Sequence, residues 1–229
     1  MTARIDVVVP AHDEQDRIGA CLAALEVAVG RLHGERPGVE VGVTVVLDGC
    51  SDDTAGLVAR HRVRVLETPH VGVGRARSLG TAQALASAPG GLHAVWLAHT
   101  DADSRVDPGW LVQQADALSD GLHLLVGAVV PDPDDLTADV LDRWRLAHPP
   151  GAALGHVHGA NLGIRADAYV AVGGFDPVRE HEDVRLVERA RALGLQVRAT
   201  TELPVVTSGR FDGRTPGGYA EHLRRTYAP

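Results

Sequence analysis

The chain has 229 residues, of which 45% are hydrophobic and 23% charged, a composition typical of a soluble globular protein. There are 30 acidic and 22 basic residues, which give a formal net charge of −8, and no basic stripe is visible, so broad nucleic-acid binding is not expected. All 22 basic residues are arginines, which excludes any mechanism that needs a Schiff-base lysine or a P-loop lysine.

Neither a transmembrane segment nor a signal peptide is expected. No apolar run approaches the roughly 18 residues of a membrane span. The amino terminus meets Asp13 and Glu14 directly after a short apolar run, unlike a signal peptide. Cys21 and Cys50 have no repeated spacing and are predicted to be reduced thiols, so we expect a cytoplasmic protein.

Strands and helices alternate over the first hundred residues. The expected elements are a strand at 5–9, a helix at 13–29, a strand at 41–47, a helix capped by Asp52 or Asp53, a strand at 63–66, a helix with Ala76, Leu79, Ala82 and Leu85 on one face, and a strand at 93–98. The strands are apolar on both faces, as in parallel sheets that helices cover on both sides. The pattern predicts an α/β fold with a Rossmann-like, mostly parallel central sheet flanked by helices.

The pattern is less regular after Trp110. The expected elements there are a strand at 122–130, a helix at 137–147, a short helix at 166–172, and a helix at 183–193 with Val184, Val187, Ala190 and Leu193 on one face.

Acidic segments follow three of the predicted strands, at 10–14, 48–53 and 101–103. Ligands of open α/β sheets bind outside the carboxyl ends of the strands, so these segments are expected to share one site. On an extended segment Asp101 and Asp103 would point the same way, and their carboxylates could converge on one cation. A polar exit from a buried strand is the alternative interpretation of an isolated Asp-x-Asp.

Four groups of residues, in order along the chain, resemble motifs of the family 2 glycosyltransferases, which have the GT-A fold. The matching residues are 7–14, 46–54, 101–103, and an acceptor-half group at 159–165, 173–176 and 182–183. Leu47 stands where the family usually has an aspartate, which leaves the choice between uracil and guanine open. The resemblance implies one GT-A domain over residues 1–229, with a nucleotide-sugar-binding half at 1–105 and an acceptor half with a C-terminal loop at 106–229.

The resemblance implies a metal-dependent enzyme that moves a hexose from a nucleotide-diphosphate sugar, with a UDP-sugar favoured, to a hydroxyl acceptor. A divalent cation, Mn²⁺ or Mg²⁺, would stabilise the leaving diphosphate and suits oxygen ligands. Asp103 would ligate the cation, and Asp101 would help or hold the ribose. The other donor contacts that the resemblance implies are Pro10, His12, Glu14, Asp48 and Arg77. Arg210 and Arg214, beyond the match, could close over the diphosphate or lie in solvent.

The acceptor hydroxyl must lose a proton as it attacks, and a carboxylate within hydrogen-bond reach can take it. By resemblance this general base is Asp183, with Glu182 as the alternative, and direct attack would invert the anomeric configuration. A plain helix-capping role for Asp183 is the competing interpretation. The expected contacts with the acceptor or the sugar are His158, Gly159, Ala160 and Asn161.

Two other functions remain open. A sugar-1-phosphate nucleotidyltransferase would use a similar sheet, but it usually has a glycine-rich loop with a basic residue where this chain has residues 10–14. A non-catalytic nucleotide-sugar-binding module would bind the donor without turnover. A zinc site at His156, His158 and His181 is not favoured, because no carboxylate partner has a suitable spacing. A homodimer is left open.

Overall fold

Within the residues that the computed structural model describes, 3–88, 91–149, 151–152, 154, 156–178, 180–213 and 217–228, eight strands form one sheet. The strands are β1 (Arg4–Ala11), β2 (Glu40–Asp48), β3 (Arg64–Thr68), β4 (Val95–His99), β5 (Ser104–Arg105), β6 (Leu124–Pro131), β7 (Leu162–Arg165) and β8 (Val197–Thr207). Their order across the sheet is β3-β2-β1-β4-β7-β6-β8-β5. β1 pairs in parallel with β2 and β4, and β7 is antiparallel to β4 and β6.

The helices alternate with the strands along the chain. The α-helices are α1 (Ile18–Glu35), α2 (Thr54–Val58), α3 (Val73–Ala86), α4 (Trp110–Ser119), α5 (Ala138–Ala147), α6 (Ala166–Ala171), α7 (Glu182–Ala192) and α8 (Tyr219–Tyr227). Short 3-10 turns are η1 (Leu92–Ala94), η2 (Pro133–Asp135) and η3 (Gly159–Asn161).

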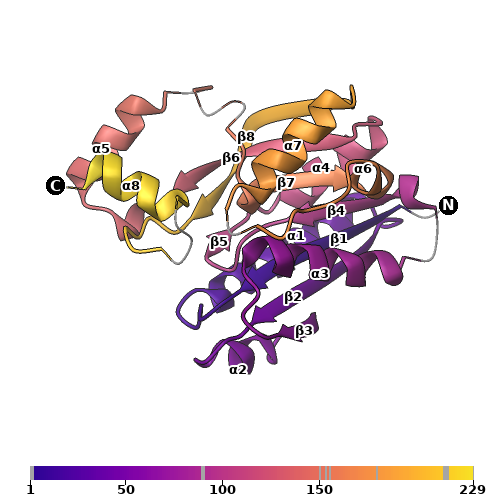
Figure 1. The fold of residues 1–229 in the computed structure, drawn as a ribbon, viewed down its shortest axis with the longest axis horizontal. Helices are drawn as coiled ribbons and strands as arrows, with labels where there is room; N and C mark the ends of the chain where they lie inside the picture. Colours follow the sequence, from indigo (N-terminus) through magenta and orange to yellow (C-terminus); the bar gives the residue numbers. More distant parts are fainter. Residues whose placement is uncertain are drawn as a thin grey trace.

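Helices cover both faces of the sheet (Figure 1). Successive strand residues point to opposite faces. Val7 of β1 therefore packs with α1 and α4 in one apolar cluster, whereas Val8 packs with Ala76 of α3 on the other face. Leu97 of β4 lies in a further cluster with α6 and α7. The predicted α/β fold, with a mostly parallel sheet flanked by helices, is confirmed.

The buried side of α3 differs from the expected one. Ala82 is exposed. The buried residues of the helix are instead Gly74, Ala76, Arg77, Gly80, Thr81 and Ala84. Small residues are required because α3 lies close to β1, where a Cβ at Gly80 would be 2.6 Å from Val8 Cγ1. The same close-packed side carries the guanidinium of Arg77 into the protein.

The sequence pattern does not predict α4, β7, β8 or α8. β8 mixes polar and apolar residues and contains Pro204, so neither alternation nor an apolar run marks it. In α8, Tyr219, Leu223 and Tyr227 are spaced by four, which is a helical signal, but the segment is too short and too polar for it to stand out. In α7 the expected inner-face residues Val187 and Ala190 are buried, but Leu193 is 58% exposed and Leu186 is buried as well.

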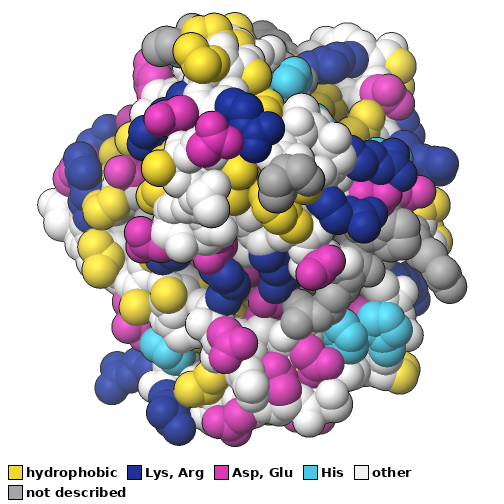
Figure 2. Space-filling view, turned by 90° about the vertical axis from the view of Figure 1, so that its left-hand side faces the viewer, with side chains coloured by type: hydrophobic (Ala, Val, Ile, Leu, Met, Phe, Trp, Pro, Cys, Tyr) yellow, Lys and Arg dark blue, Asp and Glu magenta, His cyan; other side chains and the backbone are white. Residues whose placement is uncertain are grey.

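α5 and α8 lie side by side at one end of the molecule (Figure 1). They share an apolar cluster built around Val140, Trp144, Leu223 and Tyr227, which meets the sheet through Val130 of β6 and through Tyr219. The space-filling view of this end shows arginine and acidic side chains distributed over its surface, with histidines between them (Figure 2). We refer to this helix pair, which lies beside the sheet core, as the α5–α8 wall.

His99, the last residue of β4, is buried without hydrogen-bond partners for either ring nitrogen among the described residues. Its ring meets Phe175 edge-on, with 4.8 Å between the centroids. Burial, together with the nearby positive charge of Arg77, lowers the pKa of His99 to about 3. The imidazole is therefore neutral in the folded protein at neutral pH.

We predict that His99 makes the folded protein lose stability in acid. An unfolded histidine titrates near pH 6.5, so between about pH 6.5 and 3 the unfolded chain binds a proton that the folded protein excludes. The free energy of unfolding therefore falls as the pH falls, by about 2 kcal/mol from pH 6.5 to 5. Urea unfolding at several pH values measures this, and His99→Leu should lose the contribution. Exposed His33 provides the control His33→Leu. A wild-type pH slope in His99→Leu would contradict the prediction.

Candidate active site

The carboxyl ends of β1 and β2 border a cavity of about 430 Å³. Among the expected donor contacts, the residues that line it are Pro10, His12, Glu14, Asp48, Asp101 and Arg210. His70 and Val71, in the loop after β3, line it as well, and the sequence analysis missed them. The structure therefore brings most of the expected nucleotide-site residues together.

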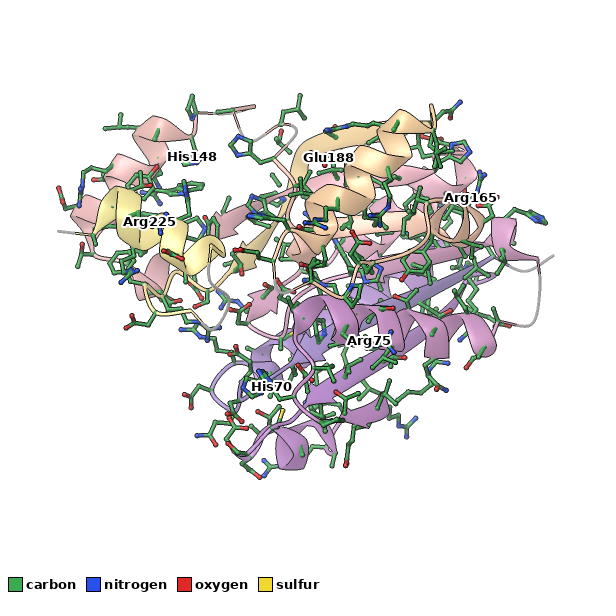
Figure 3. The ribbon with its side chains drawn as sticks, viewed as in Figure 1. His70, Arg75, His148, Arg165, Glu188 and Arg225 are labelled. Atoms are coloured by element: carbon green, nitrogen blue, oxygen red, sulfur yellow. The ribbon has the colours of Figure 1, made fainter. Side chains whose placement is uncertain are left out.

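A second cavity, of about 770 Å³, lies between the start of α7, the loop before β7, and the α5–α8 wall. The expected residues that line it are Arg77, His158, Gly159, Ala160, Glu182 and Asp183. The α5–α8 wall adds Trp144, Tyr219 and Tyr227, which the sequence analysis missed. Figure 3 labels His148, at the end of α5, and His70, which lies apart from it; each borders a different cavity.

The two cavities meet at Asp101, Asp103 and Arg210, which line both of them. The two aspartates do not lie on the extended segment that was expected. β4 ends at His99 and the chain then turns, with the Ser104 N–H donating to the Asp101 carbonyl oxygen at 3.1 Å. Because of this turn, the two carboxylates have different partners.

Asp103 is held by an arginine and by a hydroxyl of β8. Its Oδ2 lies 3.0 Å from an Arg210 guanidinium nitrogen, and its Oδ1 accepts from Thr207 Oγ1 at 3.4 Å. The same guanidinium donates to both carboxylate oxygens of Glu14, at 2.7 and 3.0 Å. Burial, with the neighbouring Asp101 carboxylate, raises the pKa of Asp103 to about 6 in spite of Arg210. Arg210 therefore lies between the carboxylates of Glu14 and Asp103.

Asp101 is bound by the other arginine. The Arg77 side chain is 3% exposed and donates through one Nη to Asp101 and through the other to Glu182. Burial raises the pKa of Glu182, and Arg77 opposes this effect. Burial alone would lower the pKa of Arg77, but Asp101 and Glu182 raise it above its usual value. The guanidinium and the Glu182 carboxylate are thus paired inside the protein.

Asp183, the second residue of α7, borders the larger cavity. Its Oδ2 accepts the Gly159 N–H at 2.6 Å, and its Oδ1 accepts the Val184 N–H at 2.7 Å. Asp183 is therefore oriented by backbone amides, whereas Glu182 is paired with a buried arginine.

The Asp48 carboxylate shapes the smaller cavity. It is 5% exposed and accepts the N–H groups of Val71 and Gly72 at 2.7 and 2.9 Å. These bonds hold the loop after β3 against the end of β2. His70 in that loop lies beside His12, with 4.3 Å between the ring centroids. Asp48 was expected to bind the base. In the structure its carboxylate holds the loop after β3, which forms one wall of the smaller cavity.

Asn161 lies inside the protein, away from both cavities. It is 1% exposed and accepts the Trp110 indole N–H at 2.8 Å. Its amide nitrogen donates to the carbonyl oxygens of Ala128 and Leu203, at 2.8 and 3.2 Å. The side chain that was expected to contact the acceptor thus connects α4, β6 and β8.

In the described part of the chain, one group of three side chains brings possible metal-ligand atoms within 4.8 Å of one another: Asp13, Cys50 and Asp52. Both carboxylates already accept backbone hydrogen bonds, Asp13 from Ser51 at 2.6 Å and Asp52 from Thr54 at 3.0 Å. We assign this group to loop structure.

Comparison with known proteins identifies the family. Residues 6–171 match the family model described as glycosyl transferase family 2. The chain belongs to this family. The sequence motifs predicted this family. No curated protein sequence matches the chain.

The chain is similar in fold to glycosyltransferases of known structure. S. aureus TarS 1–349 in complex with UDP-GlcNAc matches with a TM-score of 0.65 and 15% identity, over 93% of this chain and 60% of that chain. The mannosyltransferase PcManGT from Pyrobaculum calidifontis, in complex with GDP-Man and Mn²⁺, has a TM-score of 0.64 and 17% identity, over 98% and 69%. Glucosyl-3-phosphoglycerate synthase from Mycobacterium tuberculosis, with phosphoglyceric acid, has a TM-score of 0.59 and 17% identity, over 91% and 73%. The chain thus spans 60% of the matched TarS chain.

Among the described residues of this family 2 chain, no helix combines the length and the apolar character that a membrane crossing requires.

We predict that Asn161→Ala destabilises the enzyme. The change leaves the Trp110 indole N–H and two carbonyl groups without their partner, at about 1–3 kcal/mol for each group left unsatisfied. Urea unfolding measures the loss, with Gln83→Ala, on the exposed side of α3, as the control. Wild-type stability in Asn161→Ala, together with weaker acceptor binding, would instead support the expected acceptor contact.

Proposed function

We propose that this glycosyltransferase transfers a hexose from a nucleotide-diphosphate sugar, with a UDP-sugar favoured, to an acceptor hydroxyl, with inversion at the anomeric carbon. The observation that supports this is the junction of the two cavities at Asp101 and Asp103, with the expected donor contacts on one side and Asp183 on the other. A sugar at the junction would present its anomeric carbon between the diphosphate and the acceptor hydroxyl, as a direct displacement requires. Structural neighbours in complex with UDP-GlcNAc and with GDP-Man support a nucleotide-sugar donor.

The donor nucleotide would occupy the smaller cavity against Pro10, His12 and Glu14, in front of the wall that Asp48 supports. Arg210 would then lie at the diphosphate end. Its guanidinium donates to Glu14 and faces Asp103, and it could exchange these carboxylates for phosphate oxygens, which suit its fork geometry equally well.

Mn²⁺ or Mg²⁺ fits the chemistry of the residues at the junction. Asp103 and Asp101 supply carboxylate oxygens, the ligands that these cations prefer. Glu14 and Asp103 both lie against the Arg210 guanidinium, which marks a position where a cation is stable. When bound, the cation would stabilise the negative charge of the leaving diphosphate. We assign Asp103 as a ligand, with Asp101 helping or holding the ribose.

Asp183 is the proposed general base. As the acceptor oxygen forms its bond to the anomeric carbon, its proton moves to a carboxylate oxygen of Asp183, and the bond to the diphosphate breaks with its electron pair on the diphosphate. The Gly159 and Val184 N–H groups hold the carboxylate in place for this transfer. Attack opposite the leaving group inverts the configuration.

The remainder of the acceptor would lie in the larger cavity, between the segment His158 to Ala160 and the α5–α8 wall. His158 and Tyr219 form an edge-on pair there, with 5.6 Å between the centroids. Burial lowers the pKa of His158, which keeps this contact largely uncharged. We propose a cytoplasmic location, with which the two free thiols are consistent.

A thermal-shift screen of nucleotide sugars with Mn²⁺ tests the donor assignment, because a ligand at 100 times its Kd adds about 2.7 kcal/mol of stability. Transfer to an acceptor, or slow hydrolysis of the stabilising sugar donor, would support the proposal. Pyrophosphate release from a nucleoside triphosphate and a sugar 1-phosphate would indicate a nucleotidyltransferase. Donor binding without turnover, even with acceptors supplied, would indicate a binding module.

We predict that Asp103→Asn abolishes the metal-dependent part of nucleotide-diphosphate binding, because a neutral amide is a much poorer ligand for a hard cation. Isothermal titration of the nucleotide diphosphate, with and without Mn²⁺, measures the effect. Asp116→Asn, at a position on α4 that is 50% exposed, is the matched control. Unchanged Mn²⁺ dependence in Asp103→Asn would exclude Asp103 as a ligand.

We predict that Asp183→Asn lowers kcat by about 10² to 10⁴, the usual contribution of a general base. Folding should survive because asparagine can also accept backbone N–H bonds at a helix start. Donor binding should change little, since other segments hold the nucleotide. Glu188→Gln, on the exposed side of α7 (Figure 3), is the control. Near-normal turnover of Asp183→Asn with saturating acceptor would leave Asp183 as a cap only.

A further inference from the structure

The Arg77 guanidinium has no side exposed to the donor cavity. One Nη donates to Glu182 and the other to Asp101, and the side chain is 3% exposed. Nε is also buried, without a hydrogen-bond partner among the described residues. Arg77 borders the larger cavity and not the smaller one, where the nucleotide is placed. Its two Nη groups are thus directed at protein carboxylates.

Asp101 and Glu182 lie next to the proposed metal ligand and the proposed general base, respectively. Asp101 follows β4 and lies at the junction of the cavities. Glu182 is the first residue of α7 and directly precedes Asp183. Arg77 therefore connects, through a single side chain, the turn that carries the proposed metal ligands and the helix start that carries the proposed base.

Close packing around Arg77 leaves its guanidinium little room to move. A Cβ at Gly159 would collide with the guanidinium, so the chain that donates the Gly159 N–H to Asp183 lies directly against Arg77. One turn earlier on α3, a Cβ at Gly74 would be 2.6 Å from the Asp176 carbonyl oxygen and 2.7 Å from that of Val178. α3 thus packs without a gap against the segment that leads into α7.

The charges around Arg77 also favour a fixed guanidinium at this position. Asp101, Glu182 and Asp183 all act on Arg77 electrostatically and raise its pKa. Without this cation, neighbouring carboxylates in a partly buried site repel one another, and the start of α7 would move away from Asp101.

We propose that Arg77 is a positioning residue that sets the distance between the metal-binding turn and the general base, and that Glu182 is its anchor on α7 and not an alternative base. The inference rests on the proposed function, because it takes Asp183 as the base and Asp103 as a metal ligand. It also gives Arg77 a role different from the donor contact that the family resemblance implies.

The informative variant is the double change Arg77→Met with Glu182→Gln, which removes the bridge and leaves no unpaired charge on Glu182. Arg77→Met alone leaves that carboxylate buried without its partner and should lower the Tm, which Glu182→Gln should partly restore. Arg75→Met, two residues earlier on the exposed side of α3, is the matched control (Figure 3). The measurements are Tm, the Kd of the nucleotide diphosphate with Mn²⁺, and kcat and KM with the acceptor.

For the double variant we expect Kd and KM to stay within about threefold of wild type while kcat falls about a hundredfold, as misplacement of reacting groups by about 1 Å can cause. A tenfold or larger rise in Kd would show that Arg77 contacts the donor and would overturn the inference. Wild-type kcat in the double variant would show that Arg77 only neutralises Glu182, and would overturn it equally.

Failure of the proposed function has a different signature. If the wild-type enzyme transfers or hydrolyses no nucleotide sugar, the proposed function fails. The contact between Arg77 and Glu182 is then tested by the Tm values of the two single variants and the double variant. Non-additive changes in Tm support the contact, and additive changes overturn it.

Discussion

The crowding of negative charge where the two cavities meet is the constraint on which the site depends. Glu14, Asp101, Asp103, Glu182 and Asp183 reach this region from three segments of the chain. Carboxylates repel one another strongly where water is partly excluded, so the arrangement requires cations within the protein. Two arginines supply them, and each lies against two carboxylates. A guanidinium suits this task because its planar fork donates in two directions, which a lysine ammonium does less well.

The two arginines differ in freedom. Arg77 is 3% exposed and is held between α3, β4 and α7. Arg210 is 27% exposed and lies in the segment after β8, where a change of partner requires no repacking of the core. One side of the junction is therefore rigid and the other adaptable. A rigid side suits the geometry of bond formation, and an adaptable side suits the entry and departure of a charged nucleotide.

The sequence predicts the first half of the fold well because each parallel strand is a short apolar run with an acidic or polar segment directly after it. It also predicts which residues gather at the carboxyl ends of the strands, since the topology alone brings these ends together. The pairing of individual charges is not predictable in this way: Arg77 and Glu182 are 105 positions apart, and only the packing of α3 against α7 brings them together.

Local motifs also cannot distinguish a polar residue that faces a cavity from one that faces the core. Asn161 and Asp48 stand in motifs that the family resemblance places in the site, yet the hydrogen bonds of both side chains go to protein groups. β8 escaped prediction for a related reason, because only its partners β6 and β5 make an irregular polar segment into a strand.

The apolar cluster of α5 and α8 has an evolutionary consequence. The four buried residues of these helices pack with one another, and Val130 of β6 and Tyr219 are their contacts with the sheet core. Cavity-facing residues of α5 and α8 other than Tyr219 can therefore change with little effect on the packing on either face of the sheet. The proposed acceptor side can therefore diverge at low cost to folding, while the proposed nucleotide side stays constrained by the core of the sheet.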